Sequence, residues 1–286
     1  MRDYTVFTDS SCDLSENCLA NRNVKCPRLT LKFESCDRQY LDGELEAKYF
    51  YNRLRLGDVA KTSSVNAETF ENAFEEELIH GRDILYLGIS SALSGTFSAA
   101  LTSARKLLKK YPNSKIITVD TLCASAGIAL LLDLVLEKKS NGATIDEAAD
   151  FAEKCKSKIC HWFTIDNPVY LVRSGRVKPS KAFVGNMLGI KPILAVDDSG
   201  HLVAKQRVRG RHQSVMTLAE KCRDFCLDSH RYAYISHADC ISDAEKLKEK
   251  LKEYNIETKL ITNVGAVIGA HSGPDTLALF FLGDSR

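Results

Sequence analysis

Small hydroxyl-bearing residues gather at several points of this 286-residue chain where an apolar run gives way to a helical pattern. The four clusters are Asp9-Ser10-Ser11, Thr62-Ser63-Ser64, Ser90-Ser91 and Ser94-Gly95-Thr96. A helix N-terminus has free N–H groups and a partial positive charge, so it attracts anions, and hydroxyl side chains there add donors. The clusters therefore predict a site for a carboxylate or phosphate group. The alternative interpretation of each cluster is that its Ser or Thr caps a helix.

A serine nucleophile is a second hypothesis for the same clusters. The stretch GISSA at 88–92 lacks the last glycine of the G-x-S-x-G elbow. His271 lies in the stretch AVIGAHSGPD, between an apolar run and a Gly-Pro turn, where it could donate to an anion or act as a base. An enzyme of this kind would be a hydrolase or transferase that uses Ser90, Ser91 or Ser94 with His271. The alternative for His271 is a purely structural role.

Other catalytic and cofactor motifs are absent from the sequence. It has no G-x-x-x-x-G-K-[ST], no G-x-G-x-x-G and no H-E-x-x-H. The sequence therefore lacks the motifs that are typical of kinases, dehydrogenases and zinc hydrolases. None of the ten cysteines is spaced as C-x-x-C, and we expect reduced thiols that pack as small apolar groups, with no metal and no cofactor. Lys plus Arg total 39 against 37 for Asp plus Glu, a balance that argues against nucleic acid as the main partner.

The sequence also indicates where the protein resides. The first residues, MRDYTVFTDSSCDL, carry acidic side chains where a signal peptide needs an apolar core. The most apolar helical segment, AGIALLLDLVLE, is about a dozen residues long and contains Asp133, so it is too short to span a membrane. We therefore expect a cytoplasmic protein without a transmembrane segment.

Strand-like and helix-like patterns alternate along the chain, which predicts an α/β fold with mainly parallel sheets. Strands are expected at 5–9, 24–33, 84–89, 115–120 and 161–166, with a hairpin at 192–208 and further strands near 232 and 257. Helices are expected at 45–56, from Asn66 to 79, after Ser94, at 125–139, from Thr144 to 158, and at 242–254. The pattern restarts near 160, so we predict two α/β domains, 1–160 and 161–286, with some segments crossing between them.

Seven motifs, taken together and in order, make the chain resemble the DegV family of bacterial fatty-acid-binding proteins from about residue 3 to 283. The segments are FTDSSCDL, KTSSVNAETF, YLGISSALSGTFSAA, TVDTLCASAGIALLL, FTIDNPVYLVRSGRV, LGIKPILAVDDSGHLVAKQRVRGR and VIGAHSGPD. They are similar to the family's T-D-S-x-x-D-L, T-S-x-P, I-S-S-x-L-S-G-T, D-S-x-x-x-S-x-G, L-x-x-L-x-x-G-G-R, K-P-I-L with K-x-R, and H-x-G-P-G segments. Each motif alone is weak, and the collinear series is specific.

The resemblance implies two α/β domains with a long-chain, palmitate-like fatty acid buried between them. It assigns the carboxylate to Thr62 and Ser94 and places His271 near the same head group, while Ser63, Ser91 and Gly95 complete the ligand-binding set. It further implies a carrier without catalytic residues that presents the acid to a separate fatty acid kinase, which phosphorylates the carboxyl group from ATP. A carrier for another apolar acid, branched or retinoid-like, is the third hypothesis.

The chain also departs from the family pattern. Ser64 and Val65 replace the usual Gln and Pro after Thr62-Ser63, and Ser174 replaces the first glycine of G-G-R. Asp275 stands at the final glycine of H-x-G-P-G, where an added carboxylate would repel an anion or point to solvent. A basic stretch around Arg207, Arg209 and Arg211 predicts a docking surface for an acidic face of the kinase, with a solvated strand as the alternative.

Overall fold

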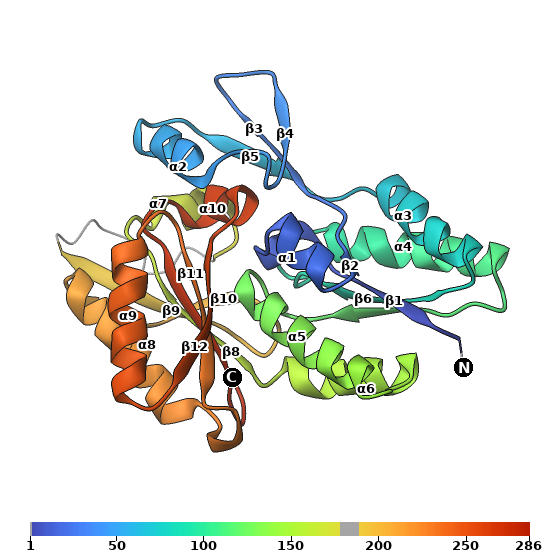
Figure 1. Cartoon of the computed structure of the whole chain (residues 1–286). Coiled ribbons are helices and arrows are strands. Elements are labelled where there is room, and N and C mark those ends of the chain that lie inside the picture. Colours follow the sequence, from blue (N-terminus) through green and yellow to red (C-terminus); the bar gives the residue numbers. More distant parts are fainter. Residues whose placement is uncertain (1, 178–188) are drawn as a thin grey trace.

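The computed structural model describes residues 2–177 and 189–286, which form three β-sheets covered by helices (Figure 1). The first is a parallel sheet in the order β2-β1-β6-β7. Its strands are β1 (Tyr4–Phe7), β2 (Val24–Lys25), β6 (Asp83–Gly88) and β7 (Ile116–Asp120). The helices around it are η1 (Ser10–Cys12), α1 (Glu16–Asn21), α3 (Ala67–Ile79), α4 (Thr96–Lys110), α5 (Ala126–Ser140) and α6 (Ile145–Lys156). This half has the parallel arrangement that the sequence predicted.

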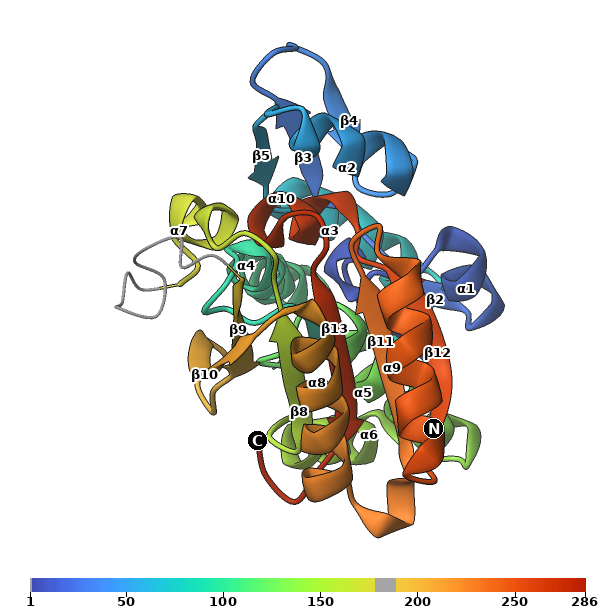
Figure 2. The same cartoon turned by 90° about the vertical axis from the view of Figure 1, so that its left-hand side faces the viewer.

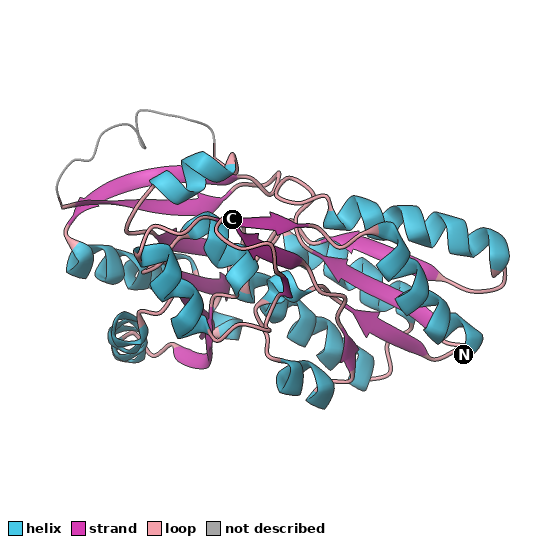
Figure 3. Ribbon diagram, turned by 90° about the horizontal axis from the view of Figure 1, so that it is seen from above, coloured by secondary structure: helices cyan, strands magenta, loops and turns pink. Residues whose placement is uncertain are grey.

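The second sheet has six strands in the order β10-β9-β8-β13-β11-β12. Its strands are β8 (Ile159–Thr164), β9 (Ile190–Val196), β10 (Leu202–Arg209), β11 (Tyr232–His237), β12 (Glu257–Asn263) and β13 (Leu277–Leu282). Helices α8 (Arg211–Phe225) and α9 (Ile241–Glu253) cover one face (Figure 2), and η2 (Asp228–His230) is a short connection. Seen from above, this sheet and the parallel sheet lie in opposite halves of an elongated molecule (Figure 3).

Strand direction in this six-stranded sheet differs from the expectation of mainly parallel sheets. Only β11 and β12, joined by helix α9, are parallel; the other four neighbouring pairs are antiparallel. The hairpin between β9 and β10 is too short for a parallel connection, which needs a crossover of a dozen or more residues. The α/β class is confirmed, but an apolar run indicates a strand without giving its direction.

A small third sheet forms a lobe over the junction of the two halves (Figure 1). It contains β3 (Thr30–Phe33), β4 (Gln39–Leu41) and β5 (Ala60–Ser63), and α2 (Ala47–Arg55) precedes β5. Helix α10 (Ala266–Ser272), from the C-terminal half, packs against α2, β3 and β5, and α7 (Val169–Ser174) packs against α10. Segments therefore cross the division that we predicted at residue 160, and the division itself stays a prediction.

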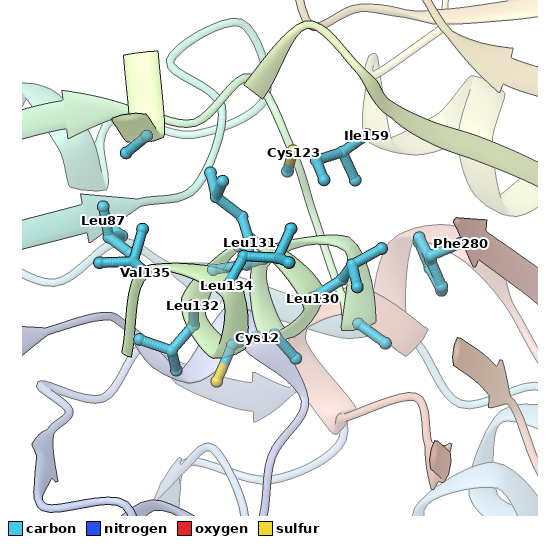
Figure 4. Packing of buried hydrophobic residues seen from close by; sticks show 14 of the residues in the cluster. Cys12, Leu87, Cys123, Leu130, Leu131, Leu132, Leu134, Val135, Ile159 and Phe280 are labelled. Atoms are coloured by element: carbon cyan, nitrogen blue, oxygen red, sulfur yellow. The ribbon is translucent and has the colours of Figure 1, made fainter. Parts of the chain in front are cut away.

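Helix α5 lies between the two large sheets and forms the centre of the main hydrophobic core. Leu130, Leu131 and Leu132 are fully buried, because the helix contacts β6 on one side and β8, β11 and β13 on the other (Figure 4). A helix that is apolar on all sides is stable only when it is covered on all sides. This packing joins the two halves into one core.

The helix caps that the sequence predicted at Asn66 and Thr144 are present in the structure. Asn66 caps α3 by accepting from the Thr69 N–H at 2.8 Å, and Thr144 and Glu147 form the expected capping box of α6. The predicted strand at 24–33 is instead divided between β2 and β3 in two sheets. Pro27 lies in the break, where its missing N–H cannot continue a sheet ladder.

The longest helices of the described ranges have 15 residues, and none is long and apolar enough to cross a membrane. All ten cysteines are in the described part of the chain and are unpaired.

Candidate functional site

A cavity lies where the parallel sheet, the small lobe and the six-stranded sheet meet. Its space not filled by protein atoms is about 910 Å³, including the part open to solvent. Its wall is mostly apolar and draws on both halves of the chain; examples are Leu29, Ile89, Leu93, Phe163, Leu171 and Phe280. Polar side chains are concentrated in a few places on this wall.

The first polar group is the pair Thr62 and His271. Thr62 is in β5 of the lobe, and His271 is near the end of α10; the Oγ1–Nε2 distance is 2.9 Å. Burial, aided by the Arg176 guanidinium, lowers the pKa of His271 to about 4. The imidazole is therefore neutral at pH 7 and can donate only one ring N–H.

The second polar group lies at the start of α4. Ser94 Oγ is 3.2 Å from Ser64 Oγ and 3.0 Å from Thr96 Oγ1, and it accepts from the Thr96 N–H at 3.2 Å. Ser94 precedes the N-cap residue Gly95, and its hydroxyl both satisfies the first N–H of α4 and lines the cavity, so the two interpretations of its cluster are compatible. Thr62 and Ser64, two residues apart at the end of an extended strand, both line the same wall.

Arg176 is a cavity residue that the sequence analysis did not select. It is exposed and lines the cavity, while its Nε donates to the Leu93 carbonyl at 3.3 Å and its Nη1 to the Ser174 carbonyl at 2.5 Å. A guanidinium held at this position makes the surrounding potential positive, which favours an anionic ligand. The signal that could have identified it is the arginine that ends the segment LVRSGR.

The other predicted ligand-binding residues lie around this group. Ser63 is exposed at the end of β5 and, between Thr62 and Ser64 on an extended strand, is not part of the cavity wall. Ser91 is exposed, and its N–H donates to Asp120 at 3.1 Å, so it also lies outside the wall. Gly95 precedes α4, and a Cβ built there would be 3.5 Å from Ser64 Oγ.

The serine-nucleophile hypothesis has little geometric support. Ser90 is fully buried, and its hydroxyl donates to the Gly200 carbonyl at 3.0 Å, in the turn of the β9–β10 hairpin. Within residues 2–177 and 189–286, no hydrogen bond joins a histidine to Ser90, Ser91 or Ser94, and His271 contacts Thr62 instead. A triad needs the base within hydrogen-bond reach of the nucleophile.

Asp9, from the first hydroxyl cluster, does not line the cavity but holds the loop that leads to Ser94. Asp9 is buried and accepts from the Ser11 N–H, the Tyr86 hydroxyl and the Ile89 N–H. These bonds hold the loop after β6, which leads to Ser94. Burial is the main cause that raises the pKa of the Asp9 carboxyl, and the hydrogen bonds oppose it.

A second buried aspartate connects the two halves through a serine of the cavity wall. Asp13 accepts from the Ser125 hydroxyl at the start of α5 and from the Gly265 N–H at 2.9 Å before α10. Ser125 Oγ is also 2.9 Å from Ser236 Oγ in β11, and both serines line the cavity. Burial raises the pKa of Asp13 well above its usual value.

Comparison with known proteins identifies the family. A family model described as "Uncharacterised protein, DegV family" matches residues 3–284. The chain belongs to the DegV family. A DegV domain-containing protein of Clostridium perfringens is 39% identical over all of this chain and 99% of its own length. A protein of Thermotoga maritima named "Fatty acid-binding protein" is 34% identical over 95% of each chain.

A solved structure supports the same conclusion. A DegV lipid-binding protein from Thermotoga maritima has a TM-score of 0.86 and 28% identity, with 99% of both chains covered. The two-domain DegV fold is thus the fold of this chain. These two relatives, named for fatty-acid or lipid binding, cover 95% and 99% of this chain.

The departures from the DegV motifs are accommodated locally. Asp275 has φ of 61°, the left-handed region that glycine adopts most easily, and its carboxylate pairs with Arg55 of α2 at 3.1 Å. The same guanidinium pairs with Asp239, so the added charge at position 275 is compensated. Ser174 ends α7, with its hydroxyl donating to the Leu171 carbonyl at 2.9 Å, and Val65 is buried.

The predicted docking arginines differ in their environments. Arg207 and Arg209 are exposed on β10, an edge strand of the six-stranded sheet. Arg211, at the start of α8, is partly buried, and its Nε pairs with Asp243 of α9 at 2.8 Å. Arg211 therefore has a structural contact within the fold, while Arg209 offers its side chain to solvent.

Proposed function

We propose that this DegV protein binds one long-chain fatty acid in the cavity, with the carboxylate at the Thr62–His271 pair and the tail along the apolar wall. The observation that carries the proposal is a cavity that combines a polar group, formed by Thr62, Ser94 and His271 with Arg176, and a mostly apolar lining. A monocarboxylic acid with a long hydrocarbon chain has the same combination. The family relatives named for fatty-acid binding support this assignment.

The head group and the tail would contribute differently to binding. Burial of a hydrocarbon chain contributes about 0.8 kcal/mol per CH₂, before the costs of immobilising the ligand. A carboxylate buried without partners is expensive, so hydroxyl and imidazole donors are needed to offset its desolvation. While Thr62 and His271 stay paired, they can together supply one donor to the ligand: the Thr62 hydroxyl when the His271 Nε2–H donates to Thr62, or the Nδ1–H when Thr62 donates to Nε2. Arg176 adds a positive charge nearby.

We further propose that the protein is a carrier and that a separate fatty acid kinase phosphorylates the bound carboxyl group. This function needs no nucleophile or cofactor in the carrier. The exposed Arg209 on edge strand β10 is a candidate contact for an acidic face of the kinase. We expect Arg209→Ala to retain palmitate binding and to slow phosphorylation in a reconstituted assay; an unchanged rate at limiting carrier concentrations would contradict this contact.

Substitution of the head-group residues tests the binding proposal. We expect Thr62→Val, which keeps the size of the side chain, and Ser94→Ala each to weaken palmitate binding by roughly 10-fold, because each removes a hydrogen bond to a charged group. The measurement is a direct titration with palmitate. Ser63→Ala is the matched control, since Ser63 is outside the wall. Equal affinities in all four proteins would remove Thr62 and Ser94 from the site.

A further inference from the structure

Five serines line the cavity, and four of them have hydrogen-bond partners. Ser64 pairs with Ser94, and Ser125 pairs with Ser236 and with Asp13. The fifth is Ser272, the last residue of α10. The residue is 6% exposed, and its Oγ has no hydrogen-bond partner in the described part of the chain. A polar group in this state loses its bonds to water without a replacement.

The surroundings of Ser272 make this unpaired hydroxyl unusual. Val267, Ile268, His271 and Ser272 are spaced three and four apart, so they share the face of α10 that lines the cavity. The two earlier positions on this face are apolar. Thr276, close by, donates its own hydroxyl to the carbonyls of Ser272 and Gly273 at 3.0 and 2.9 Å, so that hydroxyl proton is already used.

The position of Ser272 relative to the head-group residues limits what it could contact. It follows His271 directly, with adjacent Cα atoms about 3.8 Å apart. It is also more deeply buried than His271, and its carbonyl contacts Thr276, which leads into β13. Ala278 and Phe280, further along β13, line the same cavity. Ser272 is therefore next to the head-group residue His271 in the chain and shares the cavity wall with Ala278 and Phe280.

We propose that Ser272 is a specificity-determining residue that favours acyl chains with a hydroxyl group close to the carboxylate, in particular 3-hydroxy acids. The inference rests on the proposed fatty-acid function and adds a substrate class to the same cavity. Rotation about χ1 lets the serine hydroxyl meet a ligand oxygen. A plain acyl chain passes Ser272 with CH₂ groups only and leaves its hydroxyl unpaired, whereas a hydroxylated chain pairs with it.

Competition between two ligands tests this inference. We would titrate the protein with palmitate and with each enantiomer of 3-hydroxypalmitate, because a fixed donor distinguishes the enantiomers. The quantity of interest is the ratio of the Kd for palmitate to the Kd for the favoured enantiomer. We expect Ser272→Ala to lower this ratio by roughly 3- to 10-fold, the usual effect of one neutral hydrogen bond.

Two further variants complete the design. Ser236→Ala removes another wall serine, whose hydroxyl already pairs with Ser125, and it should leave the ratio within 2-fold of the original. Ser272→Thr keeps the hydroxyl and should keep the preference, which covers the case in which Ser272→Ala does not fold. An unchanged ratio in Ser272→Ala would overturn the inference, including the case in which both affinities fall equally. Absence of palmitate binding by the original protein would instead overturn the proposed function.

Discussion

At the scale of single residues, the central feature is the neutral His271 that contacts Thr62. The unfolded chain has an ordinary histidine pKa near 6.5, whereas burial and Arg176 lower the pKa in the fold to about 4. Between pH 6.5 and pH 4 the unfolded chain therefore binds more protons at this residue than the folded protein does. By linkage, the contribution of neutral His271 to stability is complete above pH 6.5 and is lost as the pH falls to 4.

This linkage gives a pH prediction. We expect the His271 contribution to the free energy of unfolding, up to about 3 kcal/mol, to disappear between pH 6.5 and 4 in the original protein. The curve of His271→Gln should lack this contribution. Gln retains a polar group beside Thr62 without titrating. The measurement is urea denaturation at a series of pH values. Since buried Asp9 and Asp13 have raised pKa values and act in the opposite direction, only the difference between the two proteins is diagnostic, and parallel curves would contradict the assignment.

At the scale of elements, α5 packs against β8 and β13, two strands whose residues line the cavity. A close approach occurs at Gly127 near the start of α5, where a Cβ would overlap the imidazole of His161 in β8. His161 is itself buried and lines the cavity. A glycine at this point lets the helix and the sheet approach each other.

We expect Gly127→Ala to destabilise the protein by about 1–3 kcal/mol, because the added methyl group forces α5 away from β8. In an exposed helix the same substitution would stabilise the protein by up to about 1 kcal/mol. The sign of the change in the free energy of unfolding therefore distinguishes a close contact from an exposed position. Chemical denaturation measures the effect. Gly127→Ala should cost less stability in the His161→Ala background than in the original protein, because the imidazole that the new methyl group would overlap is gone. Equal costs in the two backgrounds would show that residues 127 and 161 are not in contact.

The sequence predicted local features of these elements better than their arrangement. Caps such as Asn66 and Thr144 depend on neighbouring residues, so their signals are readable along the chain. The pairing of Thr62 with His271 joins residues 209 positions apart, and only the collinear family motifs indicated it. Arg176 was missed because its position at the cavity depends on how α7 packs against α10. Strand direction in the six-stranded sheet likewise depends on tertiary contacts.

At the scale of the whole molecule, the cavity wall is shared by distant parts of the chain. Thr62 comes from the lobe, Ser94 from the parallel-sheet half, and His271 from the C-terminal half. A ligand in this cavity would contact all three and would bind the folded state alone. Binding therefore adds to the stability of the whole fold.

Native mass spectrometry of the purified protein, followed by organic extraction and lipid analysis, tests the central claim most directly. We predict one long-chain fatty acid per chain, which stays bound in the folded protein and is released on denaturation. Delipidated protein should take up added palmitate with the same stoichiometry. A bare chain that also fails to take up palmitate or oleate would contradict the account.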